Sequence, residues 1–518
     1  MRWVGERRVA LERPLDERES EENKTVQESV SEDSMMLLHG EDLNPSLLNH
    51  LRRAHLSDLE AYRLHTVGSQ VGMVSPRNEA RVITSIFAFL AKPAPSNSEQ
   101  LVSVATSAAA TKARLLFREW EPQPEIVAQN SQHDAALMEW GSKGGIESAV
   151  RPCVFLAEGR GAVASRRIEA GSDIVSVPRH FLLNAETAAA CPVFGPAISC
   201  VEGLDEGAVA MLYLLYEFGQ PESRWRAYLD DLPSDFGTVL QFSEALMERL
   251  QGTPVWQQAQ NELMLLRDTY DAVFPALSEA FPHLFPPSTC TWERWLWARC
   301  CFDSRGLRLG FPTEGEVRSL TTLAPVADLL NHGAVGAVAA KTVTDTALVF
   351  TAGAPIEAGQ SVRLFYGPLS HGESLLLYGF VADENPYERF ALTLELEDAA
   401  PQALACLETR GLDFDHNLFA NGELPQKLLD TLRICFADPE QVSRTDHHGP
   451  TDSSRDSQVY GALQQLIEAN LSAVPCIDAD ELRSKFGDKG HAVTMYIASL
   501  GHILKTNLAT MEAALRAC

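Results

Sequence analysis

The chain has 518 residues and a mass of 56.9 kDa, which corresponds to about two to four ordinary domains. Hydrophobic residues make up 45% of it and charged residues 22%, a composition that excludes a wholly disordered or fibrous protein. Asp and Glu number 70 against 43 Lys and Arg, so the formal net charge is −27. This balance argues against a general binder of phosphate backbones, because such proteins present basic surfaces. We therefore expect no nucleic-acid partner.

The ten cysteines are too sparse for a disulfide-stapled secreted protein, and they include no Cys-x-x-Cys pair. We expect neither a zinc site nor any other metal site. The longest apolar stretch, residues 83–91, is too short to cross a bilayer, and the first residues do not resemble a signal peptide. These features predict a protein of a reducing compartment with no membrane partner.

Local patterns divide the chain into six stretches. Residues 1–40 are rich in Glu and Ser and poor in aromatic residues, which predicts a disordered acidic tail. Apolar residues three and four apart predict helices in 41–135, a region without a chemical motif. From 136, short β-prone runs alternate with glycine turns until a helical block at about 205–302. Strand texture then returns in ALVFTAG and SVRLFYG, and helical periodicity covers the chain from about 388 to its end.

Three separated segments hold the unusual residues. The first is Glu158-Gly159-Arg160-Gly161, in which two glycines between β-prone runs let the backbone approach a ligand closely. No third glycine opens a helix after it, so it is not a dinucleotide fingerprint. The second segment is DLLNHG, residues 328–333. The third comprises LFYG, residues 364–367, and ESLLLYGF, residues 373–380.

Together and in this order, the segments resemble the SET-domain protein methyltransferases, specifically the subfamily typified by the lysine methyltransferase of the plant Rubisco large subunit. The resemblance covers roughly residues 150–390. It includes the stretches GRGAVASRRIEAGSDIVSVP, AMLYLLYEFGQPESRWRAYLDDLPSDFGTVLQFS, WARCCFDSRG, APVADLLNHG, AGQSVRLFYG and LLLYGFVADENP.

The resemblance implies an α+β fold: a β-rich SET core split by a helical insert, an all-α substrate-binding domain after it, and a helical region before it. The SET domain would occupy 136–388 with its insert at about 188–298. The substrate-binding domain would occupy 389–518. The alternation of β-prone and helical texture along the chain indicates the same order of elements.

The resemblance also implies S-adenosylmethionine as the cofactor. The backbone of Glu158, Gly159, Arg160 and Gly161 would hold its amino-acid end, and Arg305 would help, because a guanidinium can meet a carboxylate with two donors. The remaining cofactor residues implied by the resemblance are Asn331 through its amide, His332 mainly through its backbone, Tyr366, and Phe380 against the adenine.

Tyr366 is the catalytic residue that the resemblance implies, with its hydroxyl and neighbouring carbonyl oxygens positioning the methyl group and the incoming nitrogen. Tyr378 would line the channel that receives a lysine chain. Catalysis of this kind is mostly alignment and exclusion of water. A free lysine has a pKa of about 10.4 and must lose a proton before it attacks, which a cationic sulfonium and an apolar channel would favour.

Three functions remain open. The first is a protein-lysine N-methyltransferase that acts on a protein with an accessible lysine. The second is a protein-histidine N-methyltransferase, since one branch of the subfamily methylates an imidazole and places an Asn two residues after the motif arginine. Here that position is Leu307, an apolar substrate-binding residue, which favours lysine. The third is a catalytically inactive binding scaffold, which the joint presence of Arg305, Asn331 and Tyr366 disfavours.

The sequence also leads to expectations about the compartment and the oligomeric state of the protein. The Glu-rich N-terminus is unlike a plastid transit peptide, which is basic and poor in acidic residues. We expect a monomer in the cytosol, with the nucleus as a second compartment.

Overall fold

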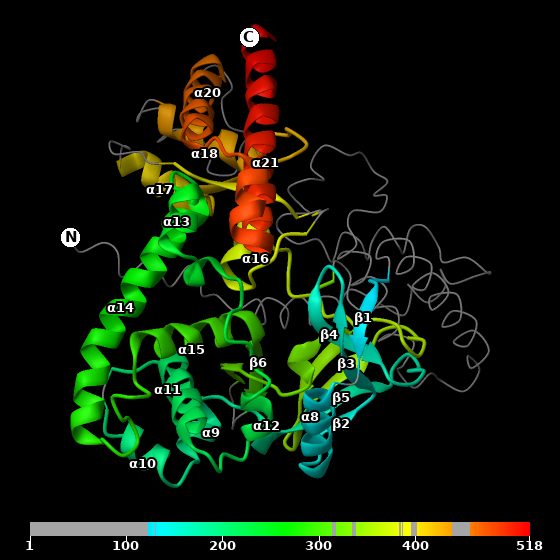
Figure 1. The fold of residues 1–518 in the computed structure, drawn as a ribbon. Coiled ribbons are helices and arrows are strands. Elements are labelled where there is room, and N and C mark those ends of the chain that lie inside the picture. The colour runs from blue at the N-terminus through cyan, green and yellow to red at the C-terminus, as the bar shows by residue number, and fades with distance from the viewer. Residues whose placement is uncertain are drawn as a thin grey trace, which may run out of the picture. The chain divides into compact units, whose positions relative to one another are not determined.

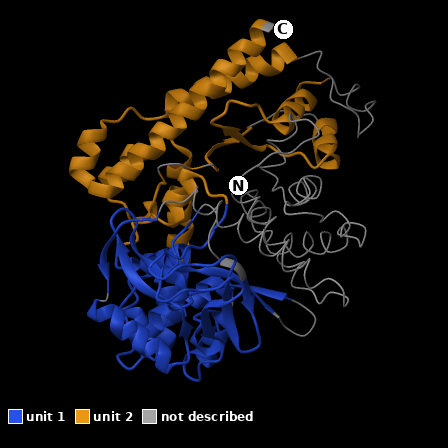
Figure 2. Ribbon diagram, turned by 90° about the vertical axis from the view of Figure 1, so that its right-hand side faces the viewer, with its two compact units in different colours: residues 1–234, 270–367 blue, residues 235–269, 368–518 orange. Residues whose placement is uncertain are grey.

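The structure is a computed structural model, and the first residue that it describes is 123. The described residues are 123–129, 131–201, 203–312, 317–333, 338–382, 385, 387–394, 401–437 and 456–517. The expected acidic tail, 1–40, and the expected helical region up to residue 122 lie outside them. The described residues form two compact units (Figure 2). Of the described residues, unit 1 contains those up to Ser234 and those within Tyr270–Gly367, and unit 2 contains those within Asp235–Thr269 and those from Pro368 onward.

Unit 1 is built on short antiparallel sheets (Figure 1). In β9, every second side chain is buried, as expected for a strand with one face toward the core. One sheet has the order β1-β3-β4, a second the order β2-β5-β9-β8, and β6 pairs with β7. The strands are β1 (Ile126–Gln129), β2 (Glu147–Ser148), β3 (Val150–Phe155), β4 (Gly159–Ala164), β5 (Asp173–Pro178), β6 (Leu307–Pro312), β7 (Val317–Thr322), β8 (Val338–Val343) and β9 (Ala347–Ala352).

Most helices of unit 1 lie between β5 and β6 in the sequence. Helices α11 and α15 pack against each other, and α15 ends where Gly306 follows Arg305. A side chain at Gly306 would place its Cβ 2.2 Å from the Phe302 oxygen, so only glycine fits there. The helices are α8 (Gln132–Lys143), α9 (Ala185–Ala189), α10 (Phe194–Ile198), α11 (Glu206–Gly219), α12 (Arg226–Leu229) and α15 (Trp292–Arg305), with the 3₁₀ turns η1 (Arg179–Phe181) and η4 (Ala327–Leu329). Helix α14 (Pro254–Ala280) belongs partly to each unit.

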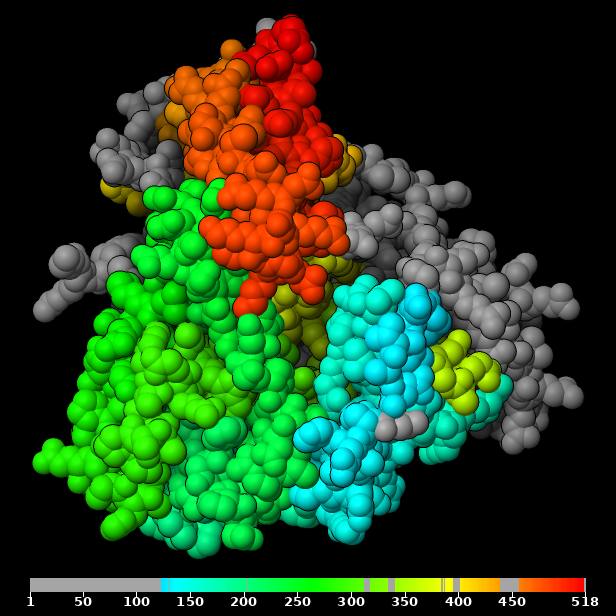
Figure 3. Space-filling model, in the orientation of Figure 1, coloured from blue at the N-terminus to red at the C-terminus, as the bar shows by residue number. Residues whose placement is uncertain are grey.

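Unit 2 is mainly helical. Helices α20 and α21 pack together, and much of α21 lies at the surface (Figure 3). Gly487 breaks the helical dihedrals of α21 with a φ of 60°, a conformation that favours glycine. The elements are η2 (Val239–Gln241), α13 (Glu244–Met247), η3 (Glu248–Leu250), α16 (His371–Leu377), β10 (Arg389–Thr393), α17 (Pro401–Thr409), β11 (Asp415–Phe419), α18 (Gln426–Phe436), α20 (Asp456–Ala473) and α21 (Ala479–Ala517).

Two features differ from the sequence expectation. The region 389–518, expected to be all-α, also contains the two-stranded sheet of β10 and β11. The expected insert, 188–298, is helical, but its segment Asp235–Thr269 belongs to unit 2 with the C-terminal part of the chain. Periodicity reports local structure and cannot show which distant segments a helix packs against. The domain bounds stay a prediction.

None of the helices in the described part of the chain is both long and apolar enough to cross a membrane.

Candidate functional site

The glycine-rich turn predicted to approach a ligand joins β3 to β4. Gly159 has a φ of 69°, which a residue with a side chain rarely adopts. Gly161 is buried, and a Cβ there would lie 2.6 Å from the Phe155 ring and 2.7 Å from the Asn331 Nδ2 atom. The absence of a side chain at Gly161 therefore lets the Asn331 amide lie directly against β4.

Glu158 and Asn331 meet beside this turn. The Asn331 Nδ2 atom lies 3.5 Å from the Glu158 carboxylate, at the outer limit of a hydrogen bond. Arg363 forms a closer ion pair with the same carboxylate, and its side chain is 15% exposed. Arg363 was not predicted, although an arginine inside the apolar run SVRLFYG was a signal that could have identified it.

Two hydrogen bonds, one from its hydroxyl and one from its main chain, join Tyr366 to the DLLNHG segment, residues 328–333. Its hydroxyl donates to the Leu330 carbonyl oxygen over 2.8 Å, and its main-chain N–H donates to the His332 Nδ1 atom over 3.2 Å. The Leu364 N–H also donates to the Asn331 oxygen over 2.9 Å, and the two segments run parallel there. Tyr366 and the DLLNHG motif, distant in sequence, thus form one hydrogen-bonded unit.

The imidazole of His332 is neutral. Burial, with the positive charge of Arg363 as a second cause, lowers the pKa of His332 to about 4. A neutral ring can accept a hydrogen bond at Nδ1, which agrees with the bond from the Tyr366 N–H.

Arg305, at the end of α15, lies in a buried polar cluster. Its Nη1 atom is 3.4 Å from both the main-chain oxygen and the carboxylate of Asp328. The Tyr228 hydroxyl donates to that carboxylate over 2.7 Å. Burial raises the pKa of Asp328, although Arg305 and Tyr228 oppose the effect. Asp328 and Tyr228 were not assigned a role from the sequence, because a single contact across 100 residues leaves no local pattern.

The Arg160 side chain forms two ion pairs with acidic residues of other elements. The guanidinium bonds Asp134 of α8 over 2.7 Å and Asp231, which follows α12, over 2.6 Å. Any contact of Arg160 with a cofactor would therefore come from its main chain, as the sequence analysis expected for the whole turn.

The other predicted residues lie on β6 and after α16. Leu307 is half-buried and opens β6, where it pairs with Thr322. Tyr378 and Phe380 belong to unit 2, where they follow α16 and their ring centroids are 6.0 Å apart. Unit 1 thus brings together six predicted residues: Glu158, Gly161, Arg305, Asn331, His332 and Tyr366.

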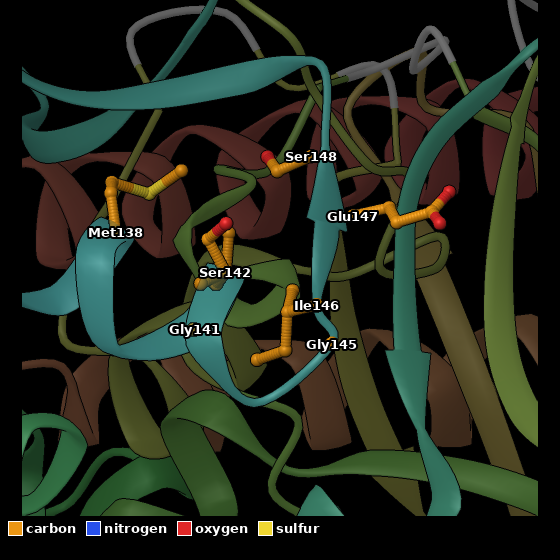
Figure 4. A pocket seen from close by; sticks show the side chains of 8 residues that line it. Met138, Gly141, Ser142, Gly145, Ile146, Glu147 and Ser148 are labelled. Atoms are coloured by element: carbon orange, nitrogen blue, oxygen red, sulfur yellow. The ribbon is translucent and has the colours of Figure 1, made fainter.

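A separate pocket of about 400 Å³ lies between α8 and β2 (Figure 4). Val326 forms part of its lining with a φ of 72°, an unusual value for a β-branched residue. The lining residues are Met138, Gly141, Ser142, Gly145, Ile146, Glu147, Ser148 and Val326, and none of them is a predicted cofactor residue. In the ranges the structure describes, no group of three or more His, Cys, Asp or Glu side chains could hold a metal ion.

No family model matches the chain. It is 27% identical over 327 residues to the actin-histidine N-methyltransferase of Mus musculus, covering 62% of this chain and 54% of that protein. It is 30% identical over 264 residues to the actin-histidine N-methyltransferase of Homo sapiens, covering 50% of this chain and 44% of that protein. The chain therefore spans about half the length of the curated relatives that it matches.

Two solved structures are similar in fold. The SET domain of Rubisco LSMT, bound to methyllysine and AdoHcy, matches with a TM-score of 0.62 and 21% identity, covering 74% of this chain and 93% of that one. Rubisco LSMT bound to AdoMet matches with a TM-score of 0.59 and 22% identity, covering 75% of this chain and 93% of that one.

Proposed function

We propose that this chain, as a SET-domain protein of the Rubisco large-subunit methyltransferase type, transfers the methyl group of S-adenosylmethionine to a nitrogen of a protein substrate. The likeness to the Rubisco LSMT structures confirms the predicted fold class, a SET core with helical additions. The observation that carries the proposed activity is Tyr366, bonded at its hydroxyl to Leu330 and at its main chain to His332, beside Asn331 and Gly161.

The residues of unit 1 fit an amino-acid group of the cofactor. An ammonium group needs acceptors, which the Glu158 carboxylate offers beside the Asn331 amide. A carboxylate needs donors, which Arg305 offers. Its distances of 3.4 Å to Asp328 are long for charge-assisted bonds, so its donors retain capacity for another partner.

S-adenosylmethionine supplies an electrophilic methyl group on a sulfonium. The proposed task of this chain is alignment, for which Tyr366 is well placed. Its hydroxyl and the Leu330 oxygen form a fixed polar pair 2.8 Å apart, and such a pair can orient an incoming nitrogen. The neutral His332 adds no positive charge that would repel the sulfonium.

The proposed acceptor is a lysine side chain. Leu307 supports this choice, because an apolar wall suits an aliphatic chain, and Tyr378 is the proposed lining of its channel. Histidine is the second candidate, since the curated relatives reported above are actin-histidine N-methyltransferases. The two acceptors differ in proton demand: a free imidazole, with a pKa of about 6.5, is mostly neutral at pH 7, and a free lysine is mostly protonated.

The deciding experiment is transfer of labelled methyl groups from S-adenosylmethionine into a cell extract, with purified actin as a parallel substrate. Mass spectrometry of the product identifies the modified residue. We expect label on lysine; label only on histidine would replace the lysine proposal with the histidine one. Isothermal titration with S-adenosylmethionine is the companion test, and folded protein that binds none of it would refute the methyltransferase proposal as a whole.

The proposal extends to the substrate, the oligomeric state and the location of the protein. We propose a protein substrate, a monomeric enzyme, and a cytosolic site of action with access to the nucleus. The net charge of −27 supports attraction of lysine-rich segments.

A further inference from the structure

Two glycines of unit 2 bring distant turns into main-chain contact. Gly379 lies between Tyr378 and Phe380 and has a φ of 78°. A Cβ at this position would lie 2.3 Å from the Phe236 oxygen and 2.5 Å from the Gly237 carbonyl carbon. Gly237 has a φ of 71°, and its own Cβ would touch the Gly379 oxygen at 3.4 Å. The backbones of the two turns therefore pack directly on each other.

The turn at Asp235–Gly237 is itself fixed by hydrogen bonds. The Gly237 N–H donates to the Asp235 Oδ1 atom over 2.9 Å, and the Phe236 N–H donates to the Gln241 Oε1 atom over 2.8 Å. The following residues are anchored in the core, since Thr238 and Val239 are fully buried. This turn is consequently a rigid surface for Gly379 to pack against.

A salt bridge joins the same turn to helix α21. The Lys489 ammonium donates to the Asp235 Oδ2 atom over 2.6 Å, and it lies 5.8 Å from the centroid of the Phe242 ring. Burial alone would raise the pKa of Asp235, but the bonds from Lys489 and the Gly237 N–H outweigh it and lower that pKa. The side chains are 28% and 55% exposed, so the pair contributes little to the free energy of unfolding.

The position of Lys489 depends on how α21 begins. Gly490 is buried, and a Cβ there would lie 2.1 Å from the Leu482 oxygen. The absence of a side chain at Gly490, together with the positive φ of Gly487, lets the first turns of α21 pack close to Gly490. Helix α16, which Tyr378 follows as its C-cap, packs against both η2 and α21.

We infer that the Asp235–Gly237 turn and Lys489 are a positioning device for the Tyr378 and Phe380 side chains. The inference rests on the proposed function for its consequence, because Tyr378 is the proposed lining of the acceptor channel. Lys489 holds Asp235, Asp235 orders the turn at Gly237, and Gly237 fixes the backbone between the two rings. The device sets where the Tyr378 ring lies within unit 2.

The test places one 3-fluorotyrosine at position 378 and records its ¹⁹F resonance in the full-length chain without cofactor or substrate. Asp235→Asn keeps an acceptor for the Gly237 N–H but removes the charge that Lys489 binds, and Lys489→Met removes the donor. We expect both variants to shift and broaden the resonance. Lys489→Arg should restore the wild-type signal. Lys485→Met is the matched control, because Lys485 is exposed on the same helix and lies over Phe486.

A second measurement follows labelled methyl transfer into cell extract and S-adenosylmethionine binding in parallel. Both Asp235→Asn and Lys489→Met should slow transfer roughly tenfold, the scale of a small misplacement of reacting groups, and this loss should exceed any fall in cofactor affinity that follows from a displaced Phe380. An unaltered ¹⁹F resonance in both variants would overturn the inference, and so would an equal change in Lys485→Met. A wild-type chain that binds no S-adenosylmethionine refutes the proposed function while leaving the ¹⁹F result interpretable. Gly379→Ala is avoided as the sole test because its clash is with backbone and the variant can fail to fold.

Discussion

The Tyr366 hydroxyl donates a hydrogen bond to the main-chain oxygen of Leu330 over 2.8 Å. The two residues are separated by 36 positions in sequence, and the oxygen belongs to the residue just before Asn331 and His332. This bond couples the hydroxyl of the proposed catalytic residue to the motif proposed to hold the cofactor.

Removing that hydroxyl tests the proposed role of Tyr366 directly. Tyr366→Phe leaves the ring and the main-chain bond to His332 in place but deletes the polar pair with Leu330. We expect methyl transfer to slow by roughly a hundredfold, because alignment of the nitrogen is lost, with the affinity for S-adenosylmethionine nearly unchanged. Tyr216→Phe on α11 is the control, since Tyr216 packs through its ring against Phe194. Equal transfer rates in Tyr366→Phe and wild type would remove Tyr366 from the mechanism.

Gly161 offers a test of the proposed cofactor site that does not depend on activity. In Gly161→Ala, the added methyl would lie 2.6 Å from the Phe155 ring and 2.7 Å from the Asn331 amide, so the amide must move. We expect the affinity for S-adenosylmethionine, measured by titration calorimetry, to fall roughly tenfold, about 1.4 kcal/mol.

Gly461→Ala in α20 is the matched control for this change, because nothing lies within 4 Å of its Cβ. It should bind the cofactor like wild type. If Gly161→Ala also bound it with wild-type affinity, Gly161 would not border the cofactor.

The residues that sequence reasoning identified share one property: each stands inside a short motif. Gly161, Asn331 and Tyr366 each belong to a run of four to six residues whose order is distinctive, and the structure brings those three runs together. The residues it missed act through contacts between segments that are far apart in sequence. Tyr228 is 100 positions from Asp328, and the partner of Arg363 is 205 positions away.

In the fold, too, features set by local sequence were predictable and contacts between distant segments were not. The order of β-prone and helical stretches followed from periodicity, which is a local signal. The β10–β11 pairing and the assignment of Asp235–Thr269 to unit 2 depend on which surfaces meet after collapse. The contact of Gly237 with Gly379 is of this second kind: each glycine alone indicates only a turn.

Tyr228 tests the buried polar cluster around Arg305. Tyr228→Phe leaves the buried Asp328 carboxylate without its 2.7 Å donor, and its Oδ1 atom already lacks a hydrogen-bond partner among the residues described. We expect the free energy of unfolding to fall by about 1–3 kcal/mol. The thermal transition should recover part of this loss when S-adenosylmethionine is added, because a ligand that binds only the folded state stabilises it. An unchanged free energy of unfolding would show that Asp328 does not need this donor.

Glu388, in unit 2, predicts a specific pH dependence of stability. Its carboxylate accepts from the His371 N–H over 2.6 Å and from Asn385 over 3.2 Å, and Ser499, Arg389, Tyr496 and the His371 ring also face it. Burial nevertheless raises the pKa of Glu388 from its ordinary value of 4.5 to about 7. The folded chain therefore holds a proton there between these two pH values that the unfolded chain has released.

The sign follows from this difference in bound protons. Because the folded state binds more protons at Glu388, its contribution to stability is complete below pH 4.5 and is lost as the pH rises to about 7. His371 acts oppositely, since burial lowers its pKa, so the wild-type curve alone is not diagnostic. Glu388→Gln keeps an acceptor for the His371 N–H and removes the titration. We expect its stability relative to wild type, from urea unfolding at several pH values, to increase steadily from pH 4.5 to 7. The exposed Glu468→Gln of α20 should show no such trend, and a flat difference for Glu388→Gln would show that Glu388 does not titrate in this range.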